Sequence, residues 1–76
     1  MKLSEFIVLP QEEKRSAVLR EGVPVAQRAL EKQMVFLFQL PEFFVETYCS
    51  KESKQVEEYR TYCQPRHLQP YLEKIL

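Results

Sequence analysis

Two consecutive stretches of strand-forming residues, separated by a two-residue turn, constrain the fold of this chain more than any other feature. Residues 34–40 (MVFLFQL) are apolar at nearly every position, and residues 43–50 (FFVETYCS) are rich in aromatic and β-branched side chains. A continuous apolar run is typical of a central strand covered on both faces. Pro41 and Glu42 suit a tight corner, because proline fixes φ there. The pair predicts two inner strands of an antiparallel sheet.

A further strand is predicted on each side of this pair. Residues 55–63 (QVEEYRTYC) follow the polar loop 51–54 and form the last strand, which Pro65 ends.

Residues 23–33 (VPVAQRALEKQ) are ambiguous. The part from 26 to 33 has high helix propensity, whereas the two valines before it prefer strands. A helix reaching residue 33 would run into the next strand without a connection. The interpretation therefore favours an edge strand at 24–30 with a turn at Glu31-Lys32, and a helix is the alternative.

The first 22 residues predict two helices. Residues 3–9 (LSEFIVL) form a short helix with Ser4 as its N-cap. Pro10 suits the first position of a second helix over 10–21, where its missing N–H costs nothing. Gly22 is expected to end this helix in the left-handed conformation.

Together these segments predict one α+β domain over residues 1–76. It contains an antiparallel three- to four-stranded β-meander, two N-terminal helices and a short C-terminal helix that Pro70 begins. At 76 residues, such a domain has a free energy of unfolding of only several kcal/mol, at about 0.05–0.15 kcal/mol per residue.

The faces of the sheet follow if the two hairpin loops, Pro41-Glu42 and Glu52-Ser53, have two residues each. One face carries the helices and contains Met34, Phe36, Phe38, Leu40, Phe43, Val45, Thr47, Cys49, Val56 and Tyr62. The other face mixes apolar and polar side chains: Val35, Leu37, Phe44, Tyr48 and Tyr59 with Gln39, Glu46, Glu57 and Thr61. This second face is expected to be an interaction surface, or else the N-terminal segment folds over it.

Glu46 is the polar residue that this pattern singles out. A carboxylate in an inner strand is costly unless it is paired, and Arg28 or Arg60 can reach it, depending on the register. Glu46 is then either a salt-bridged or solvated structural residue, or the acid of a small-molecule or peptide site with Tyr48 and Tyr59.

Composition excludes several classes of function. The formal net charge is zero, whereas nucleic-acid domains carry a basic surplus. The longest apolar run is too short to span a bilayer, and residues 1–5 lack the basic start of a signal peptide, so a cytoplasmic location is expected. Cys49 and Cys63 are expected to be free thiols, with a disulfide or redox pair as the alternative. No cofactor or metal ligand set and no catalytic constellation is recognisable, so the chain is not expected to be an enzyme.

Four stretches resemble a family of short bacterial proteins of unknown function, of the kind common in Bacteroidetes. They are 5–10 (EFIVLP), 35–40 (VFLFQL), 43–48 (FFVETY) and 68–75 (LQPYLEKI). The likeness covers most of the chain and implies a strand at 23–30. Its motifs carry no chemistry, so it transfers no functional residue.

A helix at 23–33 would instead approach the element order of double-stranded-RNA-binding domains. Those domains grip phosphates with a lysine-rich start to the final helix, and residues 64–70 (QPRHLQP) lack that cluster. The function expected from the sequence is a non-catalytic protein-interaction module that self-associates through its sheet as a homodimer. Ligand binding on the sheet face and weak nucleic-acid binding are the alternatives.

Overall fold

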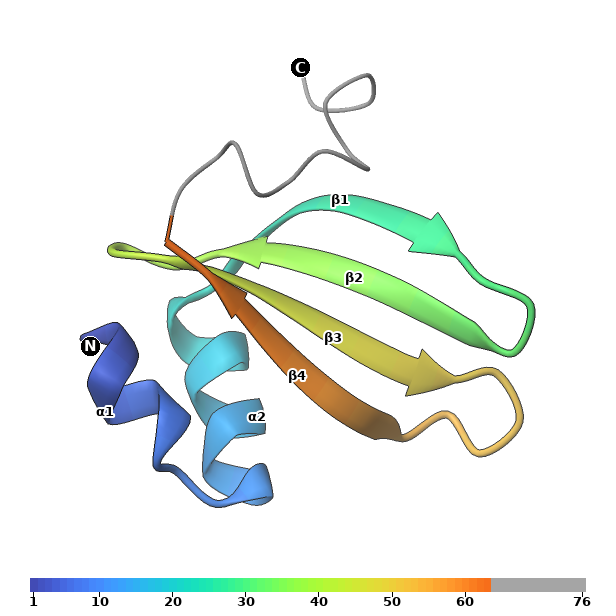
Figure 1. The fold of residues 1–76 in the computed structure, drawn as a ribbon, viewed down its shortest axis with the longest axis horizontal. Coiled ribbons are helices and arrows are strands. Elements are labelled where there is room, and N and C mark those ends of the chain that lie inside the picture. Colours follow the sequence, from blue (N-terminus) through green and yellow to red (C-terminus); the bar gives the residue numbers. More distant parts are fainter. Residues whose placement is uncertain (64–76) are drawn as a thin grey trace.

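The computed structural model describes residues 1–63, which form two helices followed by a four-stranded antiparallel sheet (Figure 1). The strands lie in chain order, so each pairs with its neighbours in the sequence. This confirms the predicted meander behind two N-terminal helices, whereas the helix predicted from Pro70 lies outside the described residues. The elements are α1 (Leu3–Ile7), α2 (Gln11–Glu21), β1 (Val23–Ala29), β2 (Gln33–Gln39), β3 (Phe44–Ser50) and β4 (Val56–Tyr62).

Helix α1 begins at Leu3, as predicted, but its N-cap is not the predicted residue. Its N-cap is Lys2, and the predicted cap Ser4 lies inside the helix. The carboxylate of Glu5 reaches back and accepts a hydrogen bond from the backbone N–H of Lys2 at 2.7 Å. A glutamate at the third helical position can thus satisfy a free N–H at the helix start without a serine cap. The helix buries Phe6 completely.

Helix α2 begins at Gln11, and Pro10 is its N-cap, whereas the prediction made Pro10 the first helical residue. Pro10 has extended backbone angles, and its carbonyl accepts hydrogen bonds from Glu13 and Lys14 at 3.0 and 2.9 Å. The side of α2 that faces the sheet buries Ala17 and Val18. No helix within residues 1–63 is long and apolar enough to cross a bilayer.

Gly22 ends α2 but is not left-handed, which corrects the prediction. Its angles are φ −87° and ψ 145°, an extended conformation open to any residue. The reason for glycine is space. A Cβ at this position would lie 2.6 Å from the carbonyl oxygen of Val18 and 3.3 Å from side-chain atoms of Leu40 and Phe38. Glycine therefore lets the end of α2 approach the sheet closely.

The ambiguous segment 23–33 contains strand β1 and a turn, as the interpretation favoured, and no helix. Strand β1 pairs with β2 through a turn at Glu31-Lys32, where the N–H of Leu30 donates to the carbonyl of Gln33 at 2.8 Å. The register shifts at Val25, directly after Pro24. A proline and a bulge suit an edge strand, because neither can continue a regular ladder.

The central hairpin has the predicted register. Phe38 pairs with Val45 and Phe36 with Thr47. The N–H of Leu40 donates to the carbonyl of Phe43 at 2.8 Å, which closes the two-residue turn.

The last hairpin departs from the predicted register through a β-bulge. Cys49 pairs with Val56 as predicted, but the next residue back, Tyr48, pairs with Glu58. One residue of β4 is therefore extra, and every later side chain of that strand changes face. Tyr59 and Thr61 lie on the helix side of the sheet, and Tyr62 lies on the opposite side, the reverse of the prediction.

The main core lies between the helices and one end of the sheet. The ring of Phe6 packs against the rings of Phe43 and Tyr59, at centroid distances of 5.5 and 6.3 Å. The buried residues of this core are Phe6, Ala17, Val18, Leu40, Phe43 and Val45. It forms on the face predicted to carry the helices.

The opposite face has a buried centre. Val35 and Leu37 are both 0% exposed, and Leu37 packs with Val25, Phe44 and Tyr62 among others. The N-terminal helices pack on the other side of the sheet, so the expectation that the N-terminal segment folds over this face is wrong. The centre of the face is buried, and its use as an interaction surface stays a prediction.

We expect Gly22→Ala to lower the free energy of unfolding by about 1–3 kcal/mol, because the added methyl group would clash with the carbonyl oxygen of Val18 and crowd Leu40 and Phe38. Urea unfolding followed by circular dichroism measures this loss. An unchanged midpoint would show that the end of α2 can move away from Leu40 freely.

Candidate functional site

Glu46 lies at the centre of a polar network on the face opposite the helices. It is 1% exposed and sits in the middle of β3. Its Oε1 accepts hydrogen bonds from the hydroxyls of Tyr48, at 3.0 Å, and of Tyr62. Its Oε2 lies 3.4 Å from a guanidinium nitrogen of Arg28. These donors come from three of the four strands.

The two arginines predicted to reach Glu46 have different partners. Arg28 reaches it, and also donates to the hydroxyl of Tyr48 at 3.1 Å. Arg60 pairs directly with Glu46 across β3 and β4, but its Nε donates to Glu58 at 2.6 Å. Its guanidinium lies 4.8 Å from the ring centroid of Tyr48, within cation–π range.

Burial and the nearby carboxylate keep the two tyrosines protonated. Burial raises the pKa of Tyr48, and the charge and hydrogen bond of Glu46 raise it further. The same causes raise the pKa of Tyr62 to about 12. A protonated phenol can donate to a carboxylate, so both hydroxyls remain donors at neutral pH.

Four of the five predicted site residues thus meet: Glu46, Tyr48, Arg28 and Arg60. The fifth, Tyr59, lies on the other face against Phe6, and burial raises its pKa. Tyr62, which the sequence interpretation placed with the helices, takes its place. The only local sequence hint of this exchange is the pair of acids at 57–58, which interrupts the alternation of polar and apolar residues in β4.

The polar groups of the network satisfy one another. Each donor to Glu46 named above comes from the same chain, and no buried polar side-chain atom among residues 1–63 lacks a hydrogen-bond partner. Within the same residues no cluster of three or more His, Cys, Asp or Glu side chains is placed to hold a metal ion. Cys49 is a half-buried free thiol and Cys63 an exposed one.

A second candidate site lies on the helix side of the sheet. Figure 1 shows α1 and α2 at the end of the sheet near the β2–β3 turn, and no helix of residues 1–63 at the end near the β3–β4 loop. Apolar side chains gather there. Leu19 is 69% exposed, and the others are half-buried. We call this region the half-exposed sheet end; it consists of Leu19, Met34, Phe36, Cys49 and Val56.

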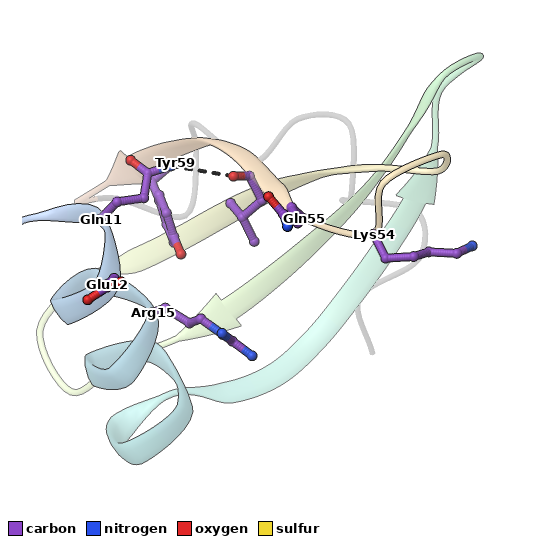
Figure 2. Close-up of a pocket in the computed structure, with 7 residues that line it drawn as sticks. Gln11, Glu12, Arg15, Lys54, Gln55 and Tyr59 are labelled. Atoms are coloured by element: carbon purple, nitrogen blue, oxygen red, sulfur yellow. Dashed lines mark hydrogen bonds between the residues drawn. The ribbon is translucent and has the colours of Figure 1, made fainter.

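Three adjoining hollows follow this region. A hollow of about 150 Å³ lies between Leu19 and the strands, over Phe36, Cys49 and Val56. It continues into one of about 230 Å³ that reaches Lys51 and Lys54. A third, of about 510 Å³, opens between the first turns of α2 and the start of β4 (Figure 2). There the side chain of Gln11 donates to the carbonyl of Val56 at 3.4 Å.

The border of these hollows is mostly basic. Arg15 lines it from α2, and Lys51 and Lys54 line it from the loop, against a single acid, Glu12. All three basic side chains are exposed, and none forms a salt bridge with a carboxylate of the described part of the chain. The sequence interpretation did not identify this site, because Arg15, Lys51 and Lys54 come together only through the fold.

No family model, curated protein or solved structure matches this chain. The resemblance to a bacterial family of unknown function therefore stays a prediction, and the candidate sites rest on the geometry of the chain alone.

We expect Glu46→Gln to lower the free energy of unfolding by about 3 kcal/mol, because it removes a buried charge and leaves Arg28 facing an amide. The matched control is Glu58→Gln, which breaks an ion pair that is about half exposed and costs less than about 1 kcal/mol. If the two variants lose equal free energy of unfolding in urea, the buried network is contradicted.

Alkaline pH should also weaken the fold. A tyrosine whose folded pKa lies above its unfolded value of 10.0 stabilises the fold below pH 10, and this contribution is lost as pH rises toward about 12. We expect the free energy of unfolding to fall across that window, and to fall less in Tyr62→Phe. Tyrosinate absorbance at high pH measures the titration. A Tyr62 that ionises near pH 10 in the folded chain would refute it.

Proposed function

We propose that this chain is a non-catalytic protein-interaction module that binds a partner segment at the half-exposed sheet end. The observation that carries the proposal is the set of apolar side chains there: Phe36, Cys49 and Val56 lie along continuous hollows, next to a leucine that is 69% exposed. Apolar surface that gathers in a hollow and has a polar border is typical of interaction sites.

The edges of the sheet are poorer candidates for pairing with a partner. Pro24 and the bulge after it interrupt β1. On β4, Glu57, Glu58 and Arg60 are exposed, and a second bulge distorts the strand. Prolines, charges and bulges at edge strands oppose the addition of another strand. A partner is therefore expected on a face.

The face opposite the helices offers a partner less accessible surface than the half-exposed sheet end. Val35, Leu37 and Glu46 at its centre are at most 1% exposed. A ligand for the Glu46 network would have to displace hydrogen bonds from Tyr48 and Tyr62 that already satisfy the carboxylate, at the cost of the buried network. This argument favours a structural role for Glu46 over a binding role.

Self-association, the form expected from the sequence, would then use the half-exposed sheet end as well. A twofold dimer pairs a patch with its own copy, so the same hollows would be covered in the dimer. The test must therefore detect both a foreign segment and a second copy.

The two free cysteines provide such a test. We expect a synthetic amphipathic helix of about 12 residues, with one leucine face and uncharged polar positions, to slow alkylation of Cys49 in the Cys63→Ser variant several-fold, because occupied apolar hollows exclude the reagent. Alkylation of Cys63 in Cys49→Ser is the control and should not change. Slower Cys49 alkylation at rising protein concentration, without peptide, would indicate self-association.

A matched pair of surface variants locates the effect. Leu19→Ser should weaken the protection, whereas Val8→Ser, which removes an apolar side chain that is 79% exposed elsewhere, should not. The proposal fails if neither peptide nor protein concentration changes the reactivity of Cys49.

A further inference from the structure

We infer that the partner segment is an acidic amphipathic helix that lies beside α2 across the half-exposed sheet end. This inference rests on the proposed function and adds the chemical class of the partner. It follows from two observations, the space that the helices leave on the sheet and the sign of the charges around that space.

The dimensions of the two layers suit a second helix. A strand of seven residues is about 23 Å long, and α2 is one helix about 10 Å wide. Figure 1 shows α2 at one end of the sheet and no helix of residues 1–63 at the end near the β3–β4 loop. The hollows over Phe36, Cys49 and Val56 extend toward that loop, and a second helix would lie there. Two helices side by side on one sheet face complete a two-layer domain.

The apolar side chains are arranged to receive such a helix. Leu19 projects from the flank of α2, and Phe36, Cys49 and Val56 form the floor. A helix placed there would bury them with its own apolar stripe, at the usual distance of about 8–10 Å between helix axes.

The basic residues lie on both sides of this floor. Arg15 is one turn before Leu19, so both lie on the same flank of α2. Lys51 and Lys54 border the opposite side. Backbone hydrogen bonds hold their loop: the N–H of Lys51 donates to Lys32 at 3.0 Å, and that of Lys54 to Ser50 at 2.9 Å. An incoming helix therefore meets Arg15 beside Glu12 along α2 and two lysines along the loop, so the border carries more positive than negative charge.

This charge pattern favours an acidic partner over a second copy of the chain. A twofold dimer through the half-exposed sheet end would bring Arg15, Lys51 and Lys54 toward the same residues of the other copy, and like charges at an interface oppose association. Glu or Asp residues flanking an apolar stripe would instead pair with all three.

The test compares three peptides of identical apolar stripe and about 12 residues, whose flanking positions are all Glu, all Gln or all Lys. Binding to the Cys63→Ser chain is measured by fluorescence anisotropy and by Cys49 alkylation. We expect the Glu peptide to bind about tenfold more tightly than the Lys peptide at low salt, since exposed ion pairs contribute modestly each and three act together. The difference should shrink at high salt.

The double variant Lys51→Glu, Lys54→Glu is the charge-reversal test. It should reduce binding of the Glu peptide several-fold and improve binding of the Lys peptide. Leu19→Ser should weaken all three peptides alike, because it removes apolar contact and no charge.

The outcomes separate this inference from the proposed function. Equal binding of the three peptides, or tighter binding of the Lys peptide, overturns the acidic partner and leaves the interaction module standing. A dimer that protects Cys49 likewise overturns the acidic partner and leaves the interaction module standing. Salt-dependent protection of Cys49 by a single-stranded oligonucleotide, without protection by any peptide, overturns both. Both are also overturned if no peptide and no increase in protein concentration protects Cys49.

Discussion

One extra residue in β4 decides how the two faces of this domain differ. Where Cys49 pairs with Val56 and Tyr48 with Glu58, the ladder skips a residue, and the side chains that follow exchange faces. Tyr62 therefore points to the side of Glu46, and Tyr59 points to the helices, where its ring meets Phe6. In a regular ladder, Tyr62 would point away from Glu46, and the carboxylate would lose a hydrogen-bond donor. Tyr59 would point away from Phe6, and the main core would lose an aromatic ring.

The Glu46 network in turn opposes any other register. A buried carboxylate is tolerated only while its hydrogen-bond donors are in place, and leaving it unpaired costs several kcal/mol in a domain whose whole stability is of that order. A slip of β4 by one residue would turn Tyr62 away from Glu46, and a slip of β1 would turn Arg28 away. Apolar packing alone discriminates registers less sharply, because one large apolar side chain can replace another. The polar centre of this face therefore contributes to the uniqueness of the fold as well as to its stability.

The sequence could predict the features that local spacing fixes, and not those that depend on contacts in the folded chain. The two-residue turn at Pro41-Glu42 leaves the central hairpin one register, so the partners of β2 and β3 followed directly from the spacing. The longer loop before β4, with Lys54 in the left-handed conformation at φ 65°, permits more than one register, and the predicted faces of β4 were wrong after the bulge. The choice of Glu46 as a paired residue was confirmed, since a charge in an inner strand needs a partner. The role of Gly22 was not predictable, because it depends on Leu40 and Phe38, which approach it only in the folded chain.

The two sides of the sheet also differ in how completely they are covered. The centre of the face opposite the helices is buried to the level of a protein core, whereas the helix side leaves Phe36, Cys49 and Val56 half-exposed beyond the flank of α2. In a chain of 76 residues, which can bury only roughly 60% of its surface, an apolar floor left half open lowers the stability of the free domain. A segment that covers the floor would stabilise the folded domain, because a ligand that binds only the folded state shifts the folding equilibrium by mass action. In the proposed complex, the exposed cations around the floor would decide which segments bind, because apolar contact is open to any apolar helix and charge discriminates among them. In the proposed complex, a partner helix that binds would also complete the helical layer, because both take place at the half-exposed sheet end.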